Sequence, residues 1–149
     1  MINVVGNAKK LLEQSNGKLI DQGTVIRFNW GGIVKPMAQG VKTHIVVTGL
    51  KHVKKTAEIY PTAIIMPTDS VPFSNTSKHA IKECDWTSSG FRVLYWLYAV
   101  KAKDVNLFGF DWDETGVYYP YGWRGDRHNY PIEKKIIGQW TEDNKWKIH

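Results

Sequence analysis

Apolar runs, a glycine turn and an amphipathic stretch follow one another at the start of the chain. Residues 4–29 read VVGNAKKLLEQSNGKLIDQGTVIRFN. The pattern predicts a strand, a turn at Gly6 and Asn7, a helix and a second strand. In the second strand, period-two alternation places Arg27 and Asn29 together on one face. This strand is therefore expected to present a polar face.

The alternation of strand and helix continues along the rest of the chain. The apolar patterns predict further strands at 44–48, 63–66 and 105–110, and helices at 51–59, 75–84, 91–103 and 131–139. Strands that alternate with helices are typical of α/β proteins with a parallel sheet. We therefore expect residues 1–149 to form one Rossmann-like domain, with a mostly parallel central sheet and helices on both faces.

The composition predicts a protein without a membrane segment. No apolar run approaches the ~20 residues that cross a bilayer. The start of the chain lacks a basic and apolar leader. The one cysteine, Cys84, cannot form an internal disulfide. Together these features predict a cytoplasmic protein in a reducing compartment.

The chain is basic and rich in tryptophan, with a formal net charge of +6 and seven tryptophans. Phosphate neutralisation and base stacking would suit a nucleic-acid-binding or base-modifying module, and equally a nucleotide-sugar site. The lysines are scattered, which is typical of solvated helix faces. The sequence has neither the three spaced glycines of a dinucleotide fingerprint nor a P-loop motif. The nucleic-acid interpretation and the nucleotide-sugar interpretation both stay open at this point.

Two turns offer backbone N–H groups to an anion. The Gly6-Asn7 turn precedes the first predicted helix, and T-S-S-G at 87–90 precedes the helix at 91–103. Unpaired N–H groups and the helix dipole favour phosphate at such a helix start. An ordinary capped core helix would explain the serines equally well.

Candidate catalytic groups lie near the end of the chain. Asp111 and Asp113 form the one D-x-D pair, and their glycine-rich aromatic surroundings predict a loop turn rather than a metal site. His128 precedes a predicted helix with Pro131 at its start and Glu133 in its first turn, which is also an ordinary capping arrangement. A histidine with a pKa near ~6.5 is a suitable general base at neutral pH.

Several of these segments together resemble the motifs of the eukaryotic-type sialyltransferases, glycosyltransferase family 29. The long sialyl motif is resembled by V-G-N, V-I-R-F-N and G-V-K-T, and the short motif by T-S-S-G and V-N-L-F-G-F. The resemblance implies a minimal version of that family, without its membrane anchor and acceptor-domain insertions. It also implies the sialyltransferase-like variant of the glycosyltransferase A fold. The family usually joins the two motifs by a disulfide, which this chain with its one cysteine cannot do.

In that family the long and short motifs bind a cytidine-nucleotide donor. The resemblance therefore implies a donor pocket that contains Gly6, Asn7, Arg27, Asn29, Thr87, Ser88, Ser89 and Gly90. No cofactor is implied besides the donor substrate, which we expect to be a CMP-sugar.

The third and last motifs imply the catalytic groups. Tyr118 stands where the family commonly has histidine, and its phenol is expected to donate a hydrogen bond to the leaving phosphate. His128 and Glu133 match the pattern H-x-x-x-x-E, which implies a general base at His128 and a positioning carboxylate at Glu133. The implied reaction is an inverting, metal-independent transfer of sialic acid or a related sugar to a glycan or another hydroxyl compound. The basic charge also leaves a nucleic acid open as the acceptor.

Overall fold

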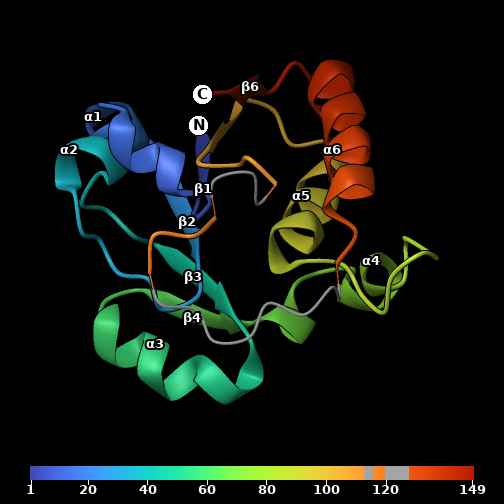
Figure 1. Cartoon of the computed structure of the whole chain (residues 1–149), viewed down its shortest axis with the longest axis horizontal. Helices are drawn as coiled ribbons and strands as arrows, with labels where there is room; N and C mark the ends of the chain where they lie inside the picture. The colour runs from blue at the N-terminus through green and yellow to red at the C-terminus, as the bar shows by residue number, and fades with distance from the viewer. Residues whose placement is uncertain (113–115, 120–127) are drawn as a thin grey trace.

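A parallel sheet is the centre of the molecule (Figure 1). The computed structural model describes residues 1–112, 116–119 and 128–149. In these residues, six strands pair in the order β4-β3-β2-β1-β5-β6, and every pair is parallel. The strands are β1 Ile2–Val5, β2 Thr24–Phe28, β3 Ile45–Thr48, β4 Ile64–Pro67, β5 Val105–Phe108 and β6 Lys147–Ile148. This arrangement confirms the predicted α/β class.

Helical segments connect the strands. The α-helices are α1 Gly17–Ile20, α2 Pro36–Gln39, α3 Val53–Ile59, α4 Ser74–Lys78, α5 Ser89–Ala99 and α6 Tyr130–Asn144. Short 3-10 helices are η1 Lys9–Glu13, η2 Leu50–His52 and η3 Thr68–Ser70. Helices α1 and α2 lie on one side of the sheet, and α5 and α6 lie on the other (Figure 1). The prediction of helices on both faces is therefore confirmed.

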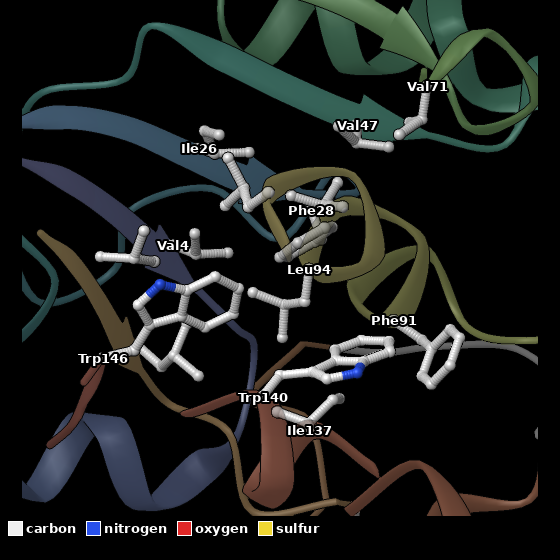
Figure 2. Close-up of a cluster of buried hydrophobic side chains, with 14 of the residues drawn as sticks. Val4, Ile26, Phe28, Val47, Val71, Phe91, Leu94, Ile137, Trp140 and Trp146 are labelled. Atoms are coloured by element: carbon white, nitrogen blue, oxygen red, sulfur yellow. The ribbon is translucent and has the colours of Figure 1, made fainter. Parts of the chain in front are cut away.

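Alternation along the strands divides the core into two layers. The larger layer joins one face of the sheet to α5 and α6, with Val4, Ile26, Leu94, Ile137 and Trp140 among its buried side chains (Figure 2). The smaller layer joins the opposite face to η1 and α1, and consists of Val5, Leu11, Ile20, Val25 and Phe108. Because neighbours in a strand point to opposite faces, Val4 and Val5 contribute to different layers.

The first predicted helix is wrong as a continuous element. Between β1 and β2 the chain forms η1, an extended residue at Gln14 and then the four-residue α1. The break includes Ser15 and Asn16, and Gly17 follows as the first residue of α1; all three residue types favour turns over a helix interior. The Gly6-Asn7 turn therefore does not open an α-helix.

Other boundaries differ more modestly from the predictions. The helix predicted at 75–84 ends at Lys78, and the one predicted to end at 139 continues to Asn144. The edge strand β6 was not predicted, because two exposed residues carry no periodic signal. In the described part of the chain, no helix combines the length and apolar character needed to cross a bilayer.

Candidate functional site

A pocket of about 870 Å³ opens at the carboxyl ends of the strands. From the central β1, the chain adds β2, β3 and β4 on one side, whereas β5 and β6 lie on the other. The strand order thus reverses between β1 and β5, and ligands of open α/β sheets bind in the crevice outside such a point. The residues that follow β1 and β5, Gly6 and Gly109, both line the pocket.

These two glycines allow the pocket floor to close. The Gly6 N–H donates to Phe108 O at 2.7 Å, and the Ala8 N–H donates to Gly109 O at 3.2 Å. A Cβ atom added to Gly6 would overlap the carbonyl oxygen of Gly109. Gly109 itself has a φ of +65°, which side-chain-bearing residues rarely adopt. The ends of β1 and β5 therefore approach each other as only glycine permits.

Asn7 continues this floor and is held in place by its side-chain amide. Its Nδ2 donates to Phe28 O at 3.0 Å and lies 3.4 Å from the Tyr119 hydroxyl oxygen. Tyr119 reaches this position because Ala8 and Val117 form an antiparallel bridge, so that a segment distant in sequence lies over the turn. Tyr119 lines the pocket as well.

Asn29 enters the pocket through an exceptional backbone conformation. It follows β2 with a φ of +58°, while its N–H still donates to Val47 O at 2.9 Å. Strand alternation alone would have placed Asn29 on the same face as Arg27. The left-handed backbone at Asn29 ends that alternation, and Asn29 lines the pocket.

The first turn of α5 forms the opposite wall. Ser88 caps this eleven-residue helix by accepting a hydrogen bond from the Phe91 N–H at 3.1 Å. The Ser88 N–H is itself bound by a carboxylate, whereas the N–H groups of Ser89 and Gly90 have no acceptor among the described residues. Both residues line the pocket. Two unpaired first-turn N–H groups therefore meet the cavity at the positive end of the helix dipole.

Glu133, in the first turn of α6, holds this wall in position. Its Oε1 accepts from the Ser88 N–H at 2.7 Å and its Oε2 accepts from the Ser88 hydroxyl at 2.6 Å. The residue is only 1% exposed. Burial raises the pKa of the Glu133 carboxyl, and the bonds from Ser88 and the charge of Arg92 oppose that rise. Glu133 is thus a positioning residue that joins the starts of α5 and α6.

His128 lies beside the same wall. Its Nδ1 is 2.8 Å from the carbonyl oxygen of Trp86, and its ring meets that of Tyr130 edge to face at 5.6 Å. A carbonyl oxygen can only accept, so Nδ1 carries the hydrogen and a neutral ring has its lone pair on Nε2. His128, Trp86 and Tyr130 all line the pocket.

The structure brings most of the predicted site residues to this one pocket. Those that line it are Gly6, Asn7, Asn29, Thr87, Ser88, Ser89, Gly90, His128 and Glu133. They come from segments far apart in the sequence, which the parallel sheet gathers at one edge. Their contacts with a donor stay a prediction.

Arg27 is placed elsewhere, so its predicted part in the donor pocket is corrected. It is 2% exposed and does not line the pocket. Its Nη2 donates to Gln39 O at 2.6 Å and its Nε to Thr43 Oγ1 at 2.9 Å. Burial lowers the pKa of Arg27. The guanidinium joins β2 to the last residue of α2 on the sheet face opposite α5.

The predicted contact between Tyr118 and the leaving phosphate is also corrected. Its hydroxyl donates to Gly32 O at 2.9 Å, and the residue does not line the pocket, whereas the next tyrosine does. Burial raises the pKa of Tyr118. Sequence reasoning chose the wrong member of the pair Tyr118-Tyr119, because only the docking of the segment onto the first turn decides which ring faces the cavity.

Sequence reasoning also missed part of the rim. Trp30 lines the pocket and lies 3.9 Å, centroid to centroid, from His52, with the Lys55 ammonium 4.9 Å from the indole centroid. Asp69 and Arg92 line it too. The loop character of the segment around Trp30 was the one signal in the sequence. No sequence pattern indicated Asp69 or Arg92.

Only one residue of the D-x-D pair, Asp111, belongs to the described part of the chain. Asp111 lines the pocket, whereas Asp113, like the aromatics Tyr121 and Trp123, lies outside the described residues. Within the described ranges, no group of three or more His, Cys, Asp or Glu side chains could hold a metal ion. Metal independence therefore stays a prediction.

Comparison with known proteins adds the fold class. A crystal structure of a mammalian sialyltransferase aligns with a TM-score of 0.68 at 19% identity, over 99% of this chain and 68% of that chain. A mammalian sialyltransferase in complex with Gal-beta-1-3GalNAc-ortho-nitrophenol gives 0.66 at 20% identity, with the same coverage of 99% and 68%. The Campylobacter jejuni sialyltransferase CstII in complex with cytidine-5'-monophosphate gives 0.64 at 15% identity, over 99% and 78%.

The fold is therefore sialyltransferase-like, as the motifs indicated. No protein-family model matches this sequence, and no curated protein does.

Proposed function

We propose that this protein is a glycosyltransferase that moves a sugar from a CMP-sugar donor to an acceptor hydroxyl, with His128 as the general base. The observation that carries this proposal is the start of α5, where the N–H groups of Ser89 and Gly90 meet the pocket without acceptors among the described residues. Such groups favour a phosphate. The glycan and CMP complexes of the structural neighbours support a sugar nucleotide and a glycan as ligands, and give no support to a nucleic-acid acceptor.

The donor phosphate would lie between the two turns. The N–H groups of Ser89 and Gly90 would bind it on one side. On the other side, Nδ2 of Asn7 would keep its hydrogen bond to Phe28 O and would give the phosphate the hydrogen that is directed at the Tyr119 hydroxyl in this structure. Asn29 and Tyr119 adjoin Asn7 and would contact the rest of the donor. Charge-assisted hydrogen bonds of this kind strengthen as negative charge develops on the departing phosphate.

In the reaction, the acceptor oxygen attacks the anomeric carbon while the bond from that carbon to the phosphate oxygen breaks. The phosphate leaves with the electron pair, and Nε2 of His128 takes the proton of the acceptor hydroxyl. The hydrogen bond from Nδ1 to Trp86 O holds the tautomer that this step requires. Attack opposite to the leaving group inverts the anomeric centre.

Binding of CMP tests the donor site. Calorimetry should show saturable binding to the protein, and Asn7→Ala should weaken it by roughly 10–100-fold, because a hydrogen bond to a charged group is lost. Asn75→Ala is the matched control, since Asn75 is exposed and does not line the pocket. Absence of binding to any pyrimidine nucleotide, or binding to oligonucleotides alone, would refute the donor-site proposal and favour the nucleic-acid alternative.

A further inference from the structure

One ion pair of the pocket wall has no role in the reaction as proposed. Arg92, in the first turn of α5, is 3% exposed, and its Nη1 donates to Asp69 Oδ1 at 2.7 Å and to Ser74 Oγ at 3.1 Å. The Asp69 side chain, by contrast, is 72% exposed, and both residues line the pocket. A buried cation therefore holds a carboxylate that itself faces the open cavity.

This asymmetry gives the Asp69 carboxylate a fixed position and a fixed charge. The guanidinium is buried against Ser74 of α4 and cannot follow a mobile partner. The Nε of Arg92 has no hydrogen-bond partner among the described residues. The positive charge of the guanidinium is compensated by Asp69 and interacts with the nearby Glu133 carboxyl. Only Oδ1 of Asp69 is engaged by Arg92, which leaves the rest of an exposed carboxylate able to accept further hydrogen bonds.

The position of Asp69 relates it to the site of the proposed reaction. Its neighbour Thr68 has its hydroxyl 2.9 Å from that of Ser89, in the turn proposed to bind phosphate. Its salt-bridge partner Arg92 stands in the same first turn of α5. Asp69 therefore lies beside the end of the pocket wall at which the phosphate is proposed to bind, and the bond that breaks in the reaction joins that phosphate to the sugar.

A carboxylate at this position selects for a particular ligand chemistry. It repels the phosphate of the donor, and it accepts hydrogen bonds from hydroxyl groups, which a saccharide presents in pairs. We infer that Asp69, held by Arg92, is a specificity-determining residue that binds hydroxyl groups of an uncharged saccharide acceptor. This inference rests on the proposed function, because it assumes that the N–H groups at the start of α5 bind the donor phosphate and leave the Asp69 carboxylate to the acceptor.

Asp69→Asn tests it with little disturbance of the fold. The asparagine carbonyl can still accept from Arg92, while the negative charge and one acceptor oxygen are lost. The probes are Gal-beta-1-3GalNAc-ortho-nitrophenol and lactose, each followed by saturation-transfer NMR on the full chain in saturating CMP. We expect at least one to bind the unmodified protein and Asp69→Asn to weaken that binding by about tenfold. CMP affinity and melting temperature should stay nearly unchanged.

Asp143→Asn is the matched control, because Asp143 is exposed, accepts one hydrogen bond from Gln139 and does not line the pocket. Unchanged saccharide binding by Asp69→Asn, or binding of CMP with neither saccharide, would overturn the inference while leaving the donor site intact. An equal loss of CMP affinity would show instead a contact with the nucleotide. Failure of the unmodified protein to bind CMP would refute the proposed function itself.

Discussion

The two glycine turns of the pocket have similar sequence patterns and different structures. At Gly6-Asn7 the chain passes into a five-residue 3-10 helix, so the turn contributes a side-chain amide and a close backbone approach. At Ser89-Gly90 it enters an eleven-residue α-helix and contributes backbone N–H groups. The comparison teaches that a glycine turn before a helical pattern does not specify how an anion is bound. The two turns differ in the element that follows, a 3-10 helix after the first and an eleven-residue α-helix after the second.

The supports of the two turns differ as well. The first is fixed by backbone contact with Gly109 and by the segment around Tyr119. The second is fixed by a buried carboxylate, Glu133, which bonds to both the N–H and the hydroxyl of Ser88. We therefore expect substitutions near the first turn to act through sterics, and those near the second through charge and protonation.

The largest effect is expected at His128, which stands beside the second turn. A positioned base typically accelerates a reaction by ~10²–10⁴, so His128→Ala should lower turnover by that factor and leave CMP affinity nearly unchanged. His79→Ala is the control, because His79 is exposed and outside the pocket. Near-normal turnover in a stable His128→Ala protein would remove the general base from the mechanism.

Gly6→Ala tests the steric support of the first turn. The added Cβ would overlap Gly109 O, and such overpacking typically costs about 1–3 kcal/mol of unfolding free energy. Gly138→Ala offers a contrast within α6, where a Cβ would meet nothing within 4 Å, and should stabilise the protein by roughly 1 kcal/mol. Urea unfolding measures both. Equal behaviour of the two variants would show that the close approach at the pocket floor is not required.

Glu133→Gln tests the charged support of the second turn. Burial raises the pKa of the Glu133 carboxyl in the folded state above its ordinary value of 4.5. The folded chain therefore binds this proton more tightly than the unfolded chain, and the resulting stability is present below pH 4.5 and is lost as pH rises through the folded-state pKa. The amide introduced by the substitution does not titrate, so the stability of the unmodified protein relative to Glu133→Gln should fall as pH rises above 4.5.

Thermal or urea unfolding between acid and neutral pH measures this difference. Glu142→Gln, at an exposed position on the same helix, is the matched control. If the unmodified protein instead gained stability relative to Glu133→Gln as pH rises, the direction given for the Glu133 pKa would be contradicted.

The smallest effect is expected from removal of divalent ions. If the helix start and Asn7 together neutralise the phosphate, no bridging cation is needed, and turnover in excess chelator should equal turnover without it. Asp111→Asn should likewise change turnover little. A complete loss of activity that added metal restores would make the D-x-D segment a ligand site and would show that the two turns do not suffice.

The sequence by itself determined β1 to β5, the second turn and the edge of the sheet at which the site forms. Short apolar runs are local signals, and Ser88 and Asn129 cap α5 and α6 through contacts within one helical turn. Because the strands are parallel, the residues that follow them must meet at one edge. The resemblance of these segments to the sialyl motifs then implied that Asn7, Asn29 and the T-S-S-G turn share one pocket.

Tertiary structure alone decided which individual side chains face that pocket. Arg27 was misplaced because the left-handed backbone at Asn29 ends the alternation that would have paired them. Tyr119 rather than Tyr118 faces the cavity because a distant segment bridges to Ala8. The pairing of Asp69 with Arg92 likewise joins two elements that no local pattern relates. Local pattern reports the preferences of neighbours in sequence, whereas these contacts depend on where the packed elements bring distant residues.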